Sequence, residues 1–173
     1  TFSIGHNLIV PMVGIAILIG ALIGIFAAKK VEMTSMPELV ALMHSFVGLA
    51  AVLIAIAAVF NTSDVHSDAQ RVELCIGAFI GAITFSASVV AFGKLSGKFN
   101  AKMIQFKGQH LLNLFLFIAM ISAGIFFYST HNTSIFLLMC FIAFALGVTL
   151  IIPIGGADMP VVVSMLNSYS GWA

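Results

Sequence analysis

A histidine in an otherwise apolar stretch is the residue of this sequence best suited to chemistry. His44 lies within 39–60, a run without Asp, Glu, Lys or Arg, and the segment around it resembles a second one near the end of the chain. When Met36 is aligned with Met159, both segments begin Met-Pro, and a serine and a glycine recur at matching later positions. His44 then falls on Asn167. A titratable group and a neutral hydrogen-bonding group thus occupy equivalent positions.

Proton binding is the chemistry that this pair can support. Histidine is the side chain that titrates near neutral pH, and an ionisable residue inside a membrane span is costly and indicates function. An amide such as Asn167 can accept from a ring N–H or donate to a bare ring nitrogen, so it can serve both protonation states of His44. We therefore expect a gated proton-binding site rather than an open pore. A purely structural histidine is the alternative.

The composition places these residues in a membrane. Hydrophobic residues make up 61% of the chain, charged residues 8%, and the mean hydropathy is +1.18, whereas soluble domains carry about 25% charged residues. The net charge of +1 argues against a nucleic-acid partner. Cys75 and Cys140 lack metal-ligand spacing, so we expect small apolar residues and neither a disulfide nor a metal site. We also expect no catalytic or cofactor-binding residue in this chain, because it contains no phosphate loop and no nucleophile motif.

Runs of about 20 apolar residues predict six membrane helices. The sequence therefore indicates an all-α fold, a polytopic transmembrane bundle. The predicted spans are 7–28, 37–60, 73–93, 109–128, 134–153 and 160–173, the last one cut short. Because the sequence starts at Thr1 without a Met and stops at Ala173 in the middle of a pattern, we expect a fragment of a longer protein.

Lysines in the connections predict which ends of the spans face the cytoplasm. They concentrate in the first and third connections, 29–36 and 94–108, whereas the second connection holds only Arg71. The positive-inside rule places these two connections and the fifth, 154–159, on the cytoplasmic side. Three lysines spaced four apart are expected to be topology determinants or contacts to anionic lipids: Lys94, Lys98 and Lys102.

Three polar side chains share one predicted depth. Pro37 and Pro160 suit the first turn of a helix, and His44 and Asn167 each follow seven residues later, about 10 Å further in. The third span runs the other way and brings Ser88 to a similar depth. Small residues share a helical stripe with each of the three, which indicates faces that point into the bundle. We predict one polar cavity opening toward the lysine-rich side. For Ser88 alone, a bond to its own helix at i−4 is the favoured reading.

Other polar and small residues are expected to have structural roles. Asp158 precedes the last predicted helix and suits an N-cap or a first-turn anion. Two glycine pairs spaced by four predict close helix packing: Gly20 with Gly24, and Gly77 with Gly81. The remaining histidines are expected to be solvated or interfacial: His6, His66, His110 and His131.

Four blocks of this sequence resemble the β subunit of proton-translocating nicotinamide nucleotide transhydrogenase. They are Lys-Lys-Val-Glu-Met-Thr at 29–34, His-Ser-Phe-Val-Gly-Leu-Ala at 44–50, Ser-Val-Val-Ala-Phe-Gly-Lys at 88–94, and the segment 155–173. The last block is long and highly specific. The spans between 109 and 153 match in hydropathy only.

The resemblance implies a function and roles for four residues. In that family a membrane domain couples inward proton movement to hydride transfer from NADH to NADP⁺, as an oxidoreductase and translocase of the Si-specific/Re-specific type. The family's membrane histidine falls on His44, its channel serine on Ser88 and its channel asparagine on Asn167. The family's loop aspartate falls on Asp158, which makes this residue a candidate for a coupling loop.

The resemblance also implies cofactors and partners outside this sequence. Residues 1–173 would be the proton-translocating membrane domain, with an NADP(H)-binding domain C-terminal to it. NAD(H) would bind to a separate α subunit, which also contributes membrane helices. We expect a second copy of the complex, a lipid bilayer and, for location, a bacterial inner membrane.

Two other classes of function fit the same helices. A proton or cation channel without hydride chemistry would need no nucleotide-binding extension. A purely structural membrane subunit would tolerate an apolar residue in place of His44.

Overall fold

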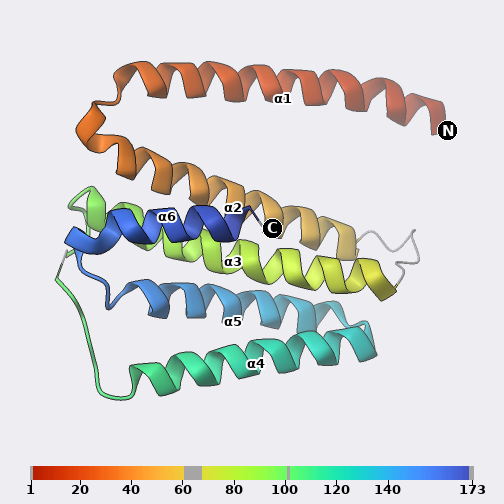
Figure 1. Cartoon of the computed structure of the whole chain (residues 1–173). Helices are drawn as coiled ribbons and strands as arrows, with labels where there is room; N and C mark the ends of the chain where they lie inside the picture. Colours follow the sequence, from red (N-terminus) through yellow and green to blue (C-terminus); the bar gives the residue numbers. More distant parts are fainter. Residues whose placement is uncertain (1, 61–67, 101, 172–173) are drawn as a thin grey trace. The chain divides into compact units, whose positions relative to one another are not determined.

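Helices dominate the computed structural model, which describes residues 2–60, 68–100 and 102–171 (Figure 1). Within these ranges there is no strand, so the predicted all-α class is confirmed. The helices are α1 (Phe2–Lys30), α2 (Met36–Phe60), α3 (Asp68–Leu95), α4 (Gln109–Thr130), α5 (Thr133–Ile151) and α6 (Met159–Ser170). Two short 3₁₀ turns, η1 (Met33–Ser35) and η2 (Gly156–Asp158), precede α2 and α6.

Five of these helices are long and apolar enough to cross a membrane. They are α1 to α5; α6 has 12 described residues. The predicted bounds agree within a few residues except at two helix starts: α1 begins at Phe2 rather than at 7, and α3 begins at Asp68 rather than at 73. The extra turn of α3 is polar, and an ion pair of 3.2 Å between Asp68 and Arg71 joins side chains one turn apart within it. A hydropathy criterion cannot include such a turn.

The chain divides into two units. Residues 1–36 form the first unit, which consists of α1 and η1, and residues 37–173 form the second. The packing predicted for Gly20 and Gly24 in α1 stays a prediction. His66 lies outside the described residues, as does the side chain of His6, whereas His110 and His131 are exposed as predicted.

In the second unit, α3 is the helix that the others surround. Glycines on two neighbours allow its backbone to be approached closely. A Cβ on Gly48 of α2 would lie 2.7 Å from the Gly81 carbonyl oxygen, and one on Gly147 of α5 would lie 2.6 Å from that of Ile83. Because only hydrogen fits at these positions, α2 and α5 both rest against the backbone of α3.

Two apolar clusters fill the space around α3. The larger one joins α3 to α2, α4 and α5, and its largest buried side chains are Met120, Phe127, Phe136 and Met139. The smaller one joins α3 to α2, to the end of α5 and to α6: Ala41, Ala87, Ala91, Ile151, Met159, Val162, Val163 and Leu166. The predicted polar residues belong to the region of this smaller cluster.

Several helix ends meet at one end of the second unit, here called the lysine end. It contains Lys94 at the end of α3 and the turn 155–158 between α5 and α6, and α2 and α4 begin on the same side (Figure 1). At the opposite end, Arg71 Nη1 lies 3.2 Å from His131 Nε2. The predicted grouping of the third and fifth connections at one end is thus observed.

Candidate proton-binding site

His44 and Asn167, 123 positions apart in sequence, meet across α2 and α6. The His44 Nε2 atom lies 2.9 Å from the amide oxygen of Asn167. The other ring nitrogen, Nδ1, donates to the Val40 carbonyl oxygen at 2.7 Å, one turn earlier in α2. Pro37 and Pro160 each lie in the first turn of their helix, as predicted. Equal depth in two helices starting at the same end therefore accounts for the contact.

The Val40 hydrogen bond fixes which ring nitrogen can change its proton. A carbonyl oxygen only accepts, so Nδ1 of His44 carries a hydrogen. Nε2 is then the ring nitrogen that can either carry a hydrogen or be bare, and it faces the amide of Asn167. The amide oxygen accepts when Nε2 is protonated; the amide nitrogen can donate when Nε2 is bare, after the amide turns over. This arrangement can bind and release one proton at one defined atom.

Ser88 is fully buried in α3, but its hydroxyl makes no hydrogen bond to any described residue. The favoured bond to its own helix is therefore not observed. Ser86, two positions earlier, does make that bond, to the Ala82 carbonyl oxygen at 3.0 Å. The structure brings His44 and Asn167 into contact but gives no hydrogen bond from Ser88 to either of them. A cavity shared by all three residues stays a prediction.

Asp158 is exposed and is the last residue of η2, directly before α6. It lines a hollow of about 510 Å³ at the lysine end, together with Lys94, Lys102 and the turn 155–157. Its own backbone N–H donates to the Gly155 carbonyl oxygen at 3.2 Å. Asp158 thus lies on the surface at the point where the chain turns into the helix that carries Asn167.

Lys94 is buried, which corrects the prediction that it contacts lipid headgroups. The side chain is 5% exposed. Its ammonium group donates to the carbonyl oxygens of Ile151 at 3.3 Å and Ile154 at 2.7 Å, and also to that of Ile152. The last carbonyls of a helix lack partners within the helix, and a cation at that end also complements the helix dipole. Lys94 therefore caps the C-terminus of α5 from α3.

Gln109 holds the same end of α5 from a third helix and was not singled out from the sequence. It is 6% exposed and donates from Nε2 to the Thr149 carbonyl oxygen at 3.2 Å. The one signal in the sequence was that Gln109 is a polar residue at the first position of the predicted span 109–128, at the end of the bundle where the predicted span 134–153 stops. Lys98 differs from Lys94: it is exposed, and its ammonium group lies 5.2 Å from the centre of the Phe92 ring.

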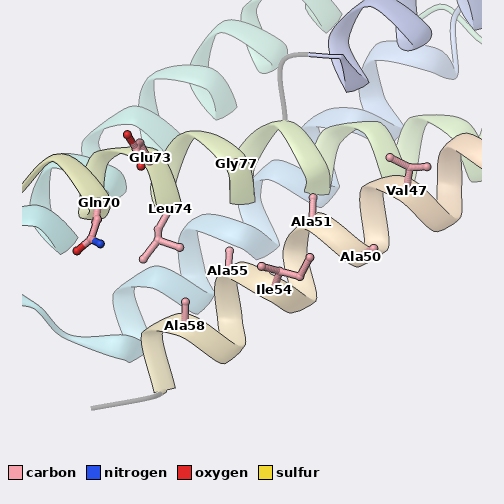
Figure 2. A pocket seen from close by; sticks show the side chains of 10 residues that line it. All are labelled: Val47, Ala50, Ala51, Ile54, Ala55, Ala58, Gln70, Glu73, Leu74 and Gly77. Carbon is pink, nitrogen blue, oxygen red and sulfur yellow. The ribbon is translucent and has the colours of Figure 1, made fainter. Parts of the chain in front are cut away.

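An apolar groove of about 590 Å³ separates α2 and α3 on the side of Arg71 (Figure 2). Four alanines of α2 form one wall together with Val47 and Ile54, and Gln70, Glu73, Leu74 and Gly77 of α3 lie along the other. A Cβ on Gly77 would meet nothing within 4 Å. Close packing was predicted for both Gly77 and Gly81, but only Gly81 lies at the crossing with α2, because the two helices diverge beyond it.

The described residues contain no group of His, Cys, Asp and Glu side chains that could hold a metal ion. Cys75 and Cys140 are both free thiols. Both belong to the larger apolar cluster or pack against it, as expected for small apolar residues.

The fold and the site together define an integral membrane protein, a polytopic α-helical bundle in which a histidine–asparagine pair joins two helices. Residues 2–173 match the family model described as NAD(P) transhydrogenase beta subunit. The chain is 50% identical over 167 residues to NAD(P) transhydrogenase subunit beta of Rhodospirillum rubrum, a match that covers 92% of this chain and 36% of that protein. A second Rhodospirillum rubrum sequence of the same name gives the same figures. The chain belongs to the NAD(P) transhydrogenase beta subunit family, and it spans about a third of the length of these relatives.

Proposed function

We propose that this chain is the membrane domain of a transhydrogenase that couples inward proton movement to hydride transfer from NADH to NADP⁺, and that His44 carries the proton. The observation that supports this most directly is the hydrogen bond of 2.9 Å between His44 on α2 and Asn167 on α6. Family membership supplies the nicotinamide chemistry. His44 is a titratable group within apolar helices, and the uncharged Asn167 can hydrogen-bond to both of its protonation states. This makes His44 suited to carry the proton.

Proton uptake and release take place at Nε2 of His44. In the neutral ring, Nδ1 carries a hydrogen and donates it to the Val40 carbonyl oxygen. Nε2 then accepts a hydrogen bond from the amide nitrogen of Asn167. When a proton reaches Nε2, a new N–H bond forms, the ring becomes an imidazolium, and Nε2 then donates to the amide oxygen. Release of the proton to an acceptor on the other side reverses both changes. Because Nδ1 is held by its own helix, the proton enters and leaves at the α6 side of the ring.

This geometry makes the proton affinity of His44 depend on the position of α6. Any movement of α6 that separates Asn167 from the ring removes a partner from one protonation state or the other. Asp158 precedes α6 and is exposed, so we propose it as part of a coupling loop between the membrane helices and a soluble domain. We place that NADP(H)-binding domain after the last helix of the full-length β subunit.

The rest of the assembly lies outside this chain. We propose an α subunit that binds NAD(H) and adds membrane helices, and a second copy of the whole complex. NAD(H) and NADP(H) bind on those soluble domains, so hydride transfer takes place outside this bundle. We place the complex in a bacterial inner membrane, with the lysine end on the cytoplasmic side because of its positive charge.

Reconstituted vesicles containing the full complex test this function. Proton uptake and hydride transfer are measured together for His44→Ala and for His110→Ala, a matched control at an exposed position at the start of α4. We expect His44→Ala to abolish pumping and slow the coupled reaction, and His110→Ala to behave as wild type. Hydride transfer that does not require NADP(H) release should survive in both variants. If His44→Ala assembled and pumped at the wild-type rate, His44 would be a packing residue.

A further inference from the structure

Two hydroxyl groups on α3 are buried without a hydrogen-bond partner among the described residues. Thr84 is 1% exposed and Ser88 is 0% exposed. They are four positions apart, so they lie one turn from each other on the same face of the helix. A buried hydroxyl without a partner is costly. Two such groups side by side therefore indicate that they share one hydrogen-bond partner.

The backbone of α3 does not satisfy these two hydroxyls, although it satisfies others in or next to the same helix. Ser86 donates to the Ala82 carbonyl oxygen, and Ser96, directly after the last residue of α3, donates to that of Phe92 at 2.7 Å. That bond to position i−4 is the usual solution for a hydroxyl in a membrane helix. Since Thr84 and Ser88 do not adopt it, their hydroxyls are available to something other than their own helix.

The position of Thr84 and Ser88 on α3 indicates which helices surround the two hydroxyls. On one flank, the backbone at Gly81 and Phe85 faces Gly48 of α2. On the other flank, Ala87 and Ala91 pack in the apolar cluster that includes four residues of α6. At helical spacing Thr84 and Ser88 lie between these two flanks. They therefore border the seam between α2 and α6, the two helices that carry His44 and Asn167.

We infer that Thr84 extends the proton pathway beyond the His44–Asn167 pair: together with Ser88, to which the family resemblance already gives a channel role, it forms a hydroxyl site that holds an internal water molecule. A buried water needs two to four polar partners, and two hydroxyls one turn apart provide two. Each hydroxyl can accept one proton while it releases another, so one O–H bond forms as one breaks and neither residue is changed. Thr84 lies about 6 Å further from the lysine end than Ser88. The site thus continues the path toward the side of Arg71.

Substitutions at Thr84 test this site, which rests on the function proposed above. Thr84→Val keeps the shape and removes the hydroxyl, whereas Thr84→Ser keeps the hydroxyl. In vesicles with the full complex, we expect Thr84→Val to lower coupled proton uptake by roughly tenfold or more, and Thr84→Ser to retain most of it. Ser86→Ala, which removes a hydroxyl that is bonded to its own helix, is the control and should pump normally.

The outcomes separate this site from the function itself. If Thr84→Val pumps at the wild-type rate while His44→Ala does not, the hydroxyl site is wrong and His44 remains the proton carrier. If both pump normally, both proposals fail. Should Thr84→Val fail to assemble, Thr84→Ser and Thr84→Ala provide a second pair of similar size that differs by one hydroxyl. Equal pumping by those two variants would overturn the site, and a deficit confined to Thr84→Ala would support it.

Discussion

The two sides of α3 differ in chemistry. The side that faces α5 is closed by Gly147 and by large apolar residues of α4 and α5, and its serine, Ser86, is bonded to its own helix. The side that faces α2 and α6 borders His44, Asn167 and two hydroxyls that find no hydrogen-bond partner in the described part of the chain. A helix packed rigidly on one side can hold polar groups at fixed depth on the other. We therefore infer that α4 and α5 act as a scaffold and that the seam of α2, α3 and α6 carries the function.

The largest expected effect is on the scaffold side. A side chain at Gly147 would collide with the Ile83 carbonyl oxygen and with the Ser86 hydroxyl. Because backbone cannot move aside cheaply, Gly147→Val should cost roughly 3 kcal/mol or more and prevent folding. The yield of monodisperse protein in detergent and its thermal unfolding measure this loss. Gly124→Ala is the control, since its nearest neighbour is the flexible Met139 Sδ at 3.4 Å; equal losses in both variants would show that the crossing is not special.

Lys94 links the two sides, and its removal should have the next largest effect. Lys94→Met keeps the length of the side chain but leaves three carbonyl oxygens at the end of α5 without their donor. We expect a loss of about 1–3 kcal/mol in unfolding free energy, measured by denaturant titration in detergent. Lys98→Met, at an exposed position, should be nearly neutral. A neutral Lys94→Met would mean that the bonds capping α5 contribute nothing to the stability of the bundle.

A charge placed in the polar seam should change pH dependence rather than stability. In Asn167→Asp the carboxylate favours the imidazolium form of His44 and cannot donate to a bare Nε2. Both effects hold the proton more tightly, so release requires a higher pH. We expect the pH profile of the coupled reaction to move to higher pH with slower turnover. Asn167→Leu should slow turnover without that shift. An unshifted profile in Asn167→Asp would mean that residue 167 does not influence the group whose protonation sets the pH profile.

The smallest effect is expected in the groove between α2 and α3. A methyl group at Gly77 meets nothing within 4 Å, and alanine is a better helix former than glycine by about 1 kcal/mol. Gly77→Ala should therefore be neutral or slightly stabilising within this bundle, in the same denaturant titration. Gly81→Ala, which would meet the Gly48 carbonyl oxygen at 2.9 Å, should be destabilising. A destabilising Gly77→Ala would indicate that another helix of the complex occupies the groove.

Hydropathy and the internal similarity were sufficient to predict the helices and the common depth of His44 and Asn167. A span of apolar residues must form a helix in lipid because its backbone has no other partners, so the segments and their order follow from composition. His44 and Asn167 occupy equal depths in helices that start at the same end, and equal depth makes a contact available. The prediction needed no knowledge of packing angles.

Packing angles decided what the sequence could not. Lys94 turns inward because α5 ends beside it, and no sequence pattern states where one helix ends relative to another. Gly77 and Gly81 each lie between an isoleucine and an alanine in the sequence, yet only Gly81 lies where α2 crosses α3. Ser86 and Ser88 likewise look equivalent in sequence, but their hydrogen bonds differ.

The most direct test is to observe the two ring nitrogens of His44 as pH changes. The full complex is labelled with ¹⁵N-histidine, and the His44 signals are assigned by their loss in His44→Ala. We predict that Nδ1, bonded to the Val40 carbonyl oxygen, stays protonated throughout, and that Nε2 gains and loses its proton across the pH range of activity. A His44 ring that titrates at Nδ1, or that does not titrate at all in that range, would contradict the proposed role of His44 and Asn167.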